Sequence, residues 1–250
     1  MGLLSSIGSF LGSVGSFISN GLSIAIGGLT GIAATIGNGI KGLCESVGSE
    51  ALALIGCIGI SILIPGFGIP EILVLIECVA EFAKKLGVND GEDSPEELGM
   101  KTEIAEKKPE DFDTIEAYIK YLNDEVELED GATENLSEID KAKYGAMGAA
   151  LNIKAIEEKY DISLSPDFLR DVTIMKLSGE EVAAYIDSFK EKGITKMQDM
   201  TDYLRDKPIE AERSTVGDSM VDVLHKLYPE LSSDDLEARL CEMRGELQSE

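Results

Sequence analysis

Apolar residues recur at helical spacing through most of this chain, and no stretch alternates in the manner of a β-strand. Clear examples are the sets Val182, Tyr185, Ile186, Phe189 and Met220, Val223, Leu224, Leu227. Residues spaced three or four apart share one face of an α-helix, which can then pack on a core. The pattern predicts an all-α protein.

The N-terminal segment is apolar in a different way, because Met1 to Ile40 combine Leu and Ile with ten glycines and no charged side chain. Small residues follow one another four apart along it: Gly15, Ser19, Ser23, Gly27, Gly31, Thr35 and Gly39. On a helix they form one ridge, and such ridges let helix backbones approach closely in lipid. We therefore interpret residues 1–50 as a glycine-zipper segment that serves helix packing and oligomerisation.

The aliphatic residues between the small ones, among them Leu22, Ile32 and Ile36, are expected to face lipid. A period of four drifts by about 40° per step around a straight helix, so the ridge favours a right-handed crossing or a break near Gly27 and Gly28. Ten glycines cost an isolated helix on the order of 10 kcal/mol in water, so we expect helix formation to depend on lipid or a partner. The alternative is a flexible glycine-rich tail.

A second apolar block spans residues 51–86 and predicts a helical hairpin. Residues 51–64 and 71–85 read as helices, and the turn between them contains Pro65, Gly66, Gly68 and Pro70. Fourteen helical residues reach about 21 Å, short of the roughly 30 Å hydrocarbon core of a bilayer. The hairpin is therefore predicted to be re-entrant, or buried in protein until a trigger releases it. The alternative is the buried hairpin of an ordinary globular protein.

Three carboxylates interrupt the second arm of this hairpin at Glu71, Glu77 and Glu81. An ionised carboxylate is costly to bring into an apolar medium and becomes protonated there instead. We interpret these residues as pH-sensitive groups, and mild acid as a trigger for insertion.

The rest of the chain is acidic: from Gly87 onward it holds 42 of the 47 acids and 19 of the 22 Lys and Arg residues. Residues 87–112 are predicted to be an acidic linker, in which Ser94 and Pro95 can start one short helix. Residues 113–250 are predicted to be an acidic all-helical domain. Capping signals mark its helix starts at Asp113, Ser137, Ser165, Ser178, Thr195, Thr215 and Ser232.

Residue types needed for catalysis are sparse, so the sequence predicts no enzyme, no cofactor and no metal site. His225 is the single histidine and no nucleophile motif accompanies it, while the four cysteines form no CxxC pair. The region from Gly87 has a net charge of −23 (19 minus 42), which disfavours binding to nucleic acid.

The N-terminus lacks the positive region of a secretory signal. We expect synthesis in the cytoplasm, followed by membrane association or secretion by a route that needs no signal peptide. The start Met1-Gly2-Leu3-Leu4-Ser5-Ser6 also matches the myristoylation pattern, which leaves acylation of Gly2 open.

The glycine ridge and the hairpin together resemble glycine-zipper membrane-active effectors secreted by bacteria, which include small pore-forming toxins delivered by contact-dependent systems. The resemblance covers about residues 1–86 and rests on the ridge from Gly15 to Gly39 and on the Ala51–Lys85 hairpin. Membrane-penetrating viral minor capsid proteins have a similar apolar start after Met-Gly, but the acidic remainder departs from their basic tails.

These features predict a self-associating, pore-forming or membrane-perturbing effector that its acidic helical domain keeps soluble. The expected partners are a lipid membrane and further copies of the chain, with a chaperone, immunity or assembly protein as additional candidates. Two alternatives stay open: a structural component of a phage, virus or secretion assembly whose apolar arm packs into that assembly, and an enzyme with a membrane anchor.

Overall fold

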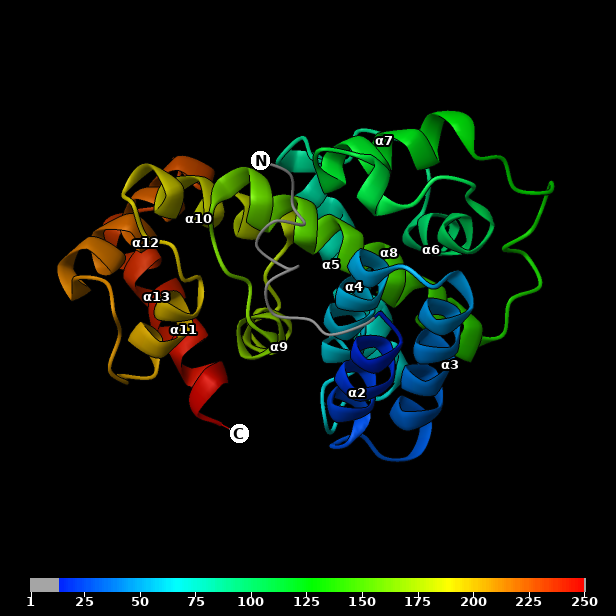
Figure 1. Ribbon diagram of the computed structural model, residues 1–250. Helices are drawn as coiled ribbons and strands as arrows, with labels where there is room; N and C mark the ends of the chain where they lie inside the picture. Colours follow the sequence, from blue (N-terminus) through cyan, green and yellow to red (C-terminus); the bar gives the residue numbers. More distant parts are fainter. Residues whose placement is uncertain (1–13, 250) are drawn as a thin grey trace. The chain divides into compact units, whose positions relative to one another are not determined.

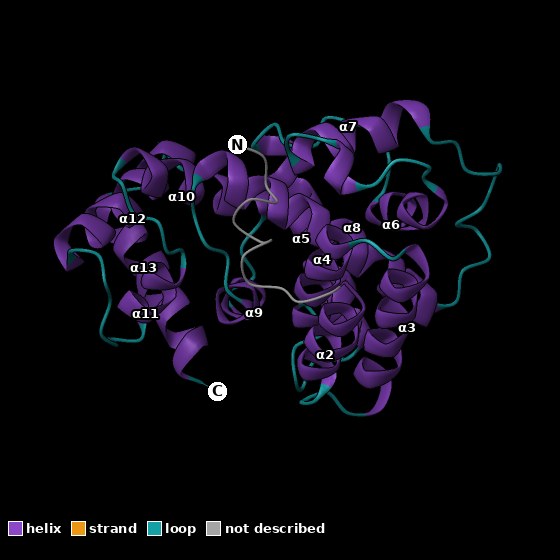
Figure 2. Cartoon of the chain, viewed as in Figure 1, coloured by secondary structure: helices purple, strands orange, loops and turns teal. Residues whose placement is uncertain are grey.

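The computed structural model describes residues 14–249 and is helical throughout, which confirms the predicted fold class (Figures 1 and 2). The described residues form twelve α-helices, one 3-10 helix and no β-strand, apart from a single parallel bridge between Ser163 and Lys196. The chain divides into two compact units, unit 1 up to Glu158 and unit 2 from Lys159 to Glu250. The Met1–Ser6 motif lies outside the described residues.

Unit 1 contains seven of the α-helices and the 3-10 helix. They are α2 (Val14–Ile26), α3 (Gly31–Val47), α4 (Glu50–Ser61), α5 (Ile69–Lys85), α6 (Pro95–Ile104), η1 (Pro109–Asp111), α7 (Ile115–Glu125) and α8 (Glu138–Tyr160).

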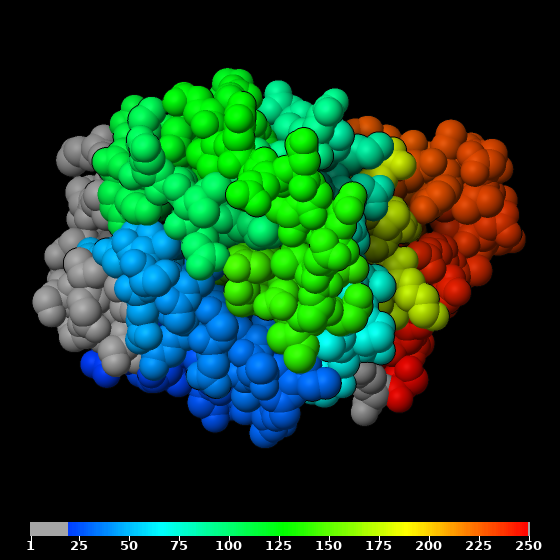
Figure 3. Space-filling model, turned by 90° about the vertical axis from the view of Figure 1, so that its right-hand side faces the viewer, coloured from blue at the N-terminus to red at the C-terminus, as the bar shows by residue number. Residues whose placement is uncertain are grey.

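Helices α2, α3 and α4 pack on one another in unit 1 (Figure 1). Their shared core contains Leu22, Ile36, Ile40, Leu52 and Ile55, all of which are essentially inaccessible to water. The expectation that Leu22 and Ile36 face lipid is therefore wrong for the packed form, in which these side chains hold the three helices together. Figure 3 shows the outer face of α3 (blue), which stays open to solvent.

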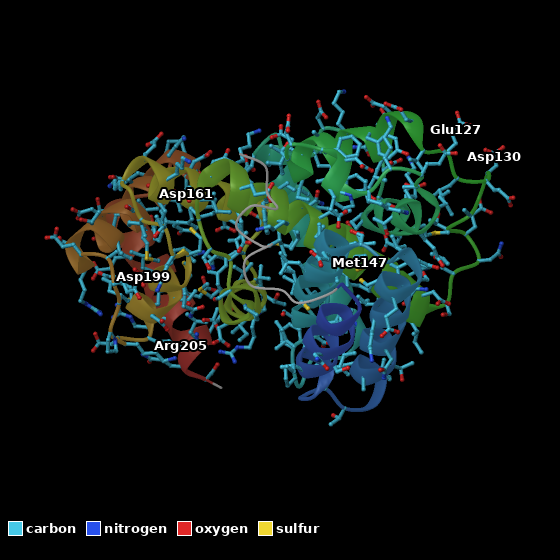
Figure 4. The ribbon with its side chains drawn as sticks, in the orientation of Figure 1. Glu127, Asp130, Met147, Asp161, Asp199 and Arg205 are labelled. Carbon is cyan, nitrogen blue, oxygen red and sulfur yellow. The ribbon has the colours of Figure 1, made fainter. Side chains whose placement is uncertain are left out.

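Helix α8 supplies the other half of the unit 1 core. Residues 145–153 of this helix are all buried, so it is covered around its circumference rather than along one stripe. Its small residues explain how neighbours come so close, because a Cβ on Gly148 would lie 2.0 Å from the Pro95 carbonyl oxygen. On α4, a Cβ on Gly59 would lie 3.0 Å from the Ala146 carbonyl oxygen. The fully buried Met147 stands at the middle of this segment (Figure 4).

Two polar side chains in the core of unit 1, Asn152 and Tyr118, lack a hydrogen-bond partner for their buried polar atoms among residues 14–249. Asn152 of α8 is fully buried, and neither its amide nitrogen nor its amide oxygen makes a hydrogen bond. An unpaired buried amide costs about 1–3 kcal/mol on the scale of mutational data. Unit 1 is therefore less stable than its apolar packing alone would make it.

The segment predicted as an acidic linker is an ordered part of unit 1. Ser94 caps α6 by accepting a hydrogen bond from the Glu97 N–H at 3.2 Å, with Pro95 in the first turn, as the sequence predicted. However, Leu98 and Thr102 of this helix are fully buried. The Ser49 hydroxyl, at the start of α4, also donates to Glu110 at 2.6 Å. The structure thus divides the chain at residue 158 and places no boundary at the predicted positions 86 and 112.

Unit 2 contains the remaining helices: α9 (Pro166–Ile174), α10 (Gly179–Glu191), α11 (Gln198–Leu204), α12 (Arg213–Leu227) and α13 (Ser233–Gln248). The predicted caps Ser165, Ser178 and Ser232 each accept a hydrogen bond from the backbone N–H three residues on. Thr195 and Thr215 do not serve as N-caps, since α11 follows Met197 and α12 follows Glu212.

An ion pair is buried within unit 2. Asp171 on α9 is fully inaccessible and accepts a hydrogen bond from the guanidinium of Arg205, which follows α11. The neighbouring Arg170 also reaches Asp171, with its Nη2 3.3 Å from Oδ1. Aromatic side chains such as Phe168, Tyr185 and Phe189 fill the rest of this core.

Candidate functional site

The end of unit 1 that holds the α2–α3 and α4–α5 turns has no charged residue within those turns, although Lys41 and Glu71 border it. Residues 14–40 and 51–70 contain no charged side chain, in a protein whose formal net charge is −25. The two turns share this end because Gly37 of α3 lies against Ile26 and Leu29 at the first turn and against Leu63 just after α4 (Figure 1). We call residues 20–36 and 63–70 the charge-free end.

Large apolar side chains face water on this end. Ile24 of α2 is 79% exposed and Ile32 of α3 is 52% exposed. Gly27, Gly28, Pro65 and Gly66 are exposed around them. Exposed aliphatic residues are ordinary when they are isolated among polar side chains, but the residues of this end are glycine, serine, threonine, apolar groups and one asparagine, with Lys41 and Glu71 at its border. The charge-free end is therefore suited to contact with an apolar or uncharged surface.

The predicted glycine ridge is divided between two helices. Gly15 and Ser19 lie in α2, and the predicted break is present, because α2 ends at Ile26 and α3 begins at Gly31. At Gly31 the backbone φ is +58°, a left-handed conformation that favours glycine.

Two of the later described ridge positions contact another element: Ser23 accepts a hydrogen bond from Lys41 of α3 at 3.1 Å, and Gly39 lies close to α8. Ser23, Gly27, Gly31 and Thr35 are exposed, whereas a Cβ on Gly39 would lie 2.9 Å from the Lys143 side chain. The role of the ridge in oligomerisation stays a prediction.

The closest backbone contacts occur elsewhere, at glycines that the ridge did not include. A Cβ on Gly99 of α6 would lie 2.0 Å from the Tyr144 carbonyl oxygen of α8, a separation as short as that at Gly148. The run Gly145 to Ala150 (GAMGAA) is the sequence signal that marks this packing. This run has no apolar periodicity of its own, so the sequence predicts α8 only as one more helix of the acidic domain.

The predicted turn residues connect α4 and α5. Gly66 has a backbone φ of +94°, and Pro70 lies in the first turn of α5, where proline is tolerated. Glu71 accepts a hydrogen bond from the Gly68 N–H at 3.0 Å and so completes the cap of α5. This capping bond gives Glu71 a structural role in the packed form.

Glu77, one of the predicted pH-sensitive carboxylates, lies in an environment that shifts its pKa. Partial desolvation, together with the nearby charge of Glu96, raises the pKa of Glu77 above that of an ordinary glutamate. Glu138 and Lys141 of α8 line the same cavity of about 390 Å³. A raised carboxyl pKa means that protonation favours the folded form, so the packed form gains stability at Glu77 as the pH falls. This effect opposes an acid trigger at Glu77.

We expect Glu77→Gln to raise the stability of unit 1 at pH 7 by less than about 1 kcal/mol, a gain limited by solvent screening. The sign follows from the raised pKa: the gain is present while wild-type Glu77 is ionised and fades as the pH falls through its folded pKa. Chemical denaturation from pH 7 to pH 4 measures it. A difference between variant and wild type that stays constant from pH 7 to pH 4 would contradict this prediction.

In unit 2 a cavity of about 450 Å³ opens beside the bridge between Ser163 and Lys196. Asp199 at its edge accepts hydrogen bonds from the N–H groups of Glu210 and Ala211 at 3.2 and 2.8 Å. Its carboxylate (labelled in Figure 4) thus anchors the segment before α12. The polar groups named here hold the fold together, and no nucleophile and base are paired among them.

Two further features of residues 14–249 bear on other kinds of site. No helix there combines the length and apolar character required to cross a membrane. No three or more His, Cys, Asp or Glu side chains are grouped there so as to hold a metal ion. No known protein family, curated protein or solved structure matches this chain.

Proposed function

We propose that this protein binds and perturbs lipid membranes through the charge-free end of unit 1. The observation that carries the proposal is the pair of exposed isoleucines, Ile24 and Ile32, on an end without charged residues. Burying a fully exposed isoleucine side chain contributes about 1.5–3 kcal/mol. The nearest charged side chain, Lys41, has a long stem that lets its ammonium stay in water when the isoleucines are buried. Shallow attachment to a bilayer is favourable on these terms.

The acidic remainder sets the orientation and the lipid preference. Acidic side chains concentrate from Gly87 onward, and the chain as a whole has a formal net charge of −25. Such a surface is repelled by anionic lipid and stays hydrated, so the charge-free end is the part that approaches the bilayer. The proposal therefore favours zwitterionic over anionic vesicles. Perturbation of the bilayer, including pore formation by several copies, is the proposed consequence of binding.

Vesicle binding by full-length protein tests this function. Ile24→Asp with Ile32→Asp places two charges on the charge-free end and should lower binding to phosphatidylcholine vesicles, and dye release from them, by at least about tenfold. Ile104→Asp is the matched control, because Ile104 is 54% exposed in unit 1 but lies beside Glu103 and Glu106. Equal loss in the two variants, or no binding by the wild type, would refute the proposal.

A second candidate function is packing into a protein assembly. The observation in its favour is the exposure of Ser23, Gly27, Gly31 and Thr35, since small residues let a partner helix approach closely. Analytical ultracentrifugation without lipid separates the two candidates. Self-association in buffer that is lost in Gly27→Leu with Gly31→Leu, without vesicle binding by the wild type, would favour assembly.

A further inference from the structure

We infer that residues 14–40 are the segment that enters the bilayer, as one continuous helix formed when the break between α2 and α3 closes. This inference rests on the proposed function and adds which residues reach the hydrocarbon. It concerns the lipid acyl chains as the binding partner, whereas attachment through Ile24 and Ile32 requires only the bilayer surface.

The separate helices α2 and α3 are too short to cross a bilayer, whereas one continuous helix over residues 14–40 is long enough. Helix α2 has 13 residues and so reaches only about 20 Å, and the uncharged part of α3, from Gly31 to Ile40, reaches about 15 Å. Neither matches a hydrocarbon core of roughly 30 Å. Joined as one helix, residues 14–40 reach about 40 Å without a charged side chain, which is enough to cross with some tilt.

The break itself is held by few local features. Gly27 donates its N–H to the Ile24 carbonyl at 3.1 Å and Leu29 donates to the Ile26 carbonyl at 2.9 Å, so the last turn of α2 tightens and stops. Thr30 occupies the cap position of α3 without a side-chain capping bond. No proline lies between residues 26 and 31. For the helix to continue, the left-handed Gly31 and the extended Thr30 (φ −133°, ψ 161°) must both change their backbone conformation, and Gly31 is the one at which a side chain is strained in the packed form.

Water favours the open turn between α2 and α3, whereas lipid favours a continuous helix. Backbone groups left unpaired at an open turn are hydrated in water but have no partner in hydrocarbon, where a continuous helix pairs them. In the packed form, the gain comes instead from α4, where Leu22 and Ile40 lie against Gly56. Those aliphatic side chains lose their contacts with α4 on opening and regain an apolar environment in lipid.

Lys41 marks the end of the segment. It is the first charged residue of the chain, it donates to the Ser23 hydroxyl at 3.1 Å across the α2–α3 pair, and it faces Glu45 at 3.6 Å. In a continuous helix Ser23 and Lys41 lie about 27 Å apart, so this bond must break when the helix forms. Lys41 then stands at the membrane interface, where a long basic side chain reaches the headgroups.

Gly31→Ala tests the conformational step. Alanine is strained in the left-handed conformation of the packed form and favoured in a helix, so the variant should need about fivefold to tenfold less protein for half-maximal dye release. Gly42→Ala is the control, because Gly42 already lies within α3, is exposed and has no atom within 4 Å of a Cβ placed there. It should leave dye release unchanged. Equal effects of the two changes would overturn the inference.

Ile32→Pro tests the continuous helix from the other side. Position 32 lies in the first turn of α3, where proline is tolerated, but in a joined helix it lies in the interior, where proline breaks the hydrogen-bond ladder. We expect vesicle binding to match that of Ile32→Ala while dye release falls at least tenfold below it. Thermal unfolding of both variants checks that the packed form persists. Dye release equal to that of Ile32→Ala would overturn the inference.

A depth probe separates failure of this inference from failure of the proposed function. Gly28→Cys, labelled with an environment-sensitive dye in a chain whose other accessible cysteines are replaced, places the probe near the middle of residues 14–40. Quenching by lipids that carry the quencher deep in the acyl chains supports insertion. Quenching by headgroup quenchers alone refutes insertion and leaves surface binding intact, whereas no vesicle binding at all refutes both.

Discussion

Gly148→Ala should destabilise unit 1 by about 3 kcal/mol or more, the upper range for overpacking a core. The added Cβ would lie 2.0 Å from the Pro95 carbonyl oxygen and 2.8 Å from its carbon, and both atoms belong to backbone at the start of α6. A side chain could turn away, but here a helix must move. Hydrogen exchange measured on peptides from α6 and α8 follows unit 1 alone, and we expect faster exchange in both helices.

Two other glycines provide a graded control for this prediction. Gly145→Ala brings a Cβ to 3.1 Å from the Ile76 side chain, which can shift, so its effect should be smaller. Gly42→Ala meets no atom within 4 Å and lies on an exposed face of α3, so it should be neutral or stabilise by up to about 1 kcal/mol. If Gly148→Ala exchanges like Gly42→Ala, the close contact of α6 with α8 is wrong.

Arg205→Met should destabilise unit 2 by about 3–5 kcal/mol, because Asp171 would remain buried without its main partner. Arg170 can offset part of the loss, since its guanidinium already reaches Asp171 from a position one-third exposed to water. Hydrogen exchange in α9 and α11 provides the measurement, and unit 1 peptides serve as the internal reference.

Two further variants show whether the burial of Asp171 is the cause. Asp171→Leu combined with Arg205→Met removes both charges and should recover most of the stability, as buried pairs replaced by apolar residues often do. Arg213→Met breaks an exposed pair with Asp206 together with hydrogen bonds to the Lys207 and Tyr203 carbonyls, and it should cost less than Arg205→Met because no buried charge is left unpaired. A double variant as unstable as Arg205→Met alone would show that packing of the arginine stem, not charge, was lost.

Local sequence signals predicted local structure well. Serine caps at Ser94, Ser165, Ser178 and Ser232 begin the helices that the sequence assigned to them, because a cap is a contact between residues three apart. The break after Ile26 was among the outcomes predicted for the glycine segment. Such features depend on a few neighbouring residues, so they can be recognised without knowing the fold.

The grouping of helices could not be predicted in the same way. Pairing of α8 with α4, α5 and α6 depends on contacts between residues far apart in sequence, such as Gly59 with Ala146 and Gly99 with Tyr144. The charge pattern suggested a boundary near Gly87, but apolar helices α4 and α5 obtain part of their cover from a helix of the acidic half. The sequence alone shows that the residues of the charge-free end are uncharged. That Ile24 is exposed and Leu22 is buried depends on how the helices pack, which the sequence pattern does not show.

The position of α8 in the chain has a consequence for synthesis. Helix α4 ends at Ser61, but the helix that covers it begins only at Glu138 and ends at Tyr160. At translation rates of about 5–20 residues per second, the ribosome needs several seconds or more to produce the intervening chain. Although α2 and α3 precede α4 and can pack on it, the faces of α4 and α5 that α8 covers in the folded protein stay open throughout that interval, and chaperones and membrane-targeting factors bind apolar surface of this kind. The order of the helices thus gives cellular factors access to the hairpin before the protein can bury it.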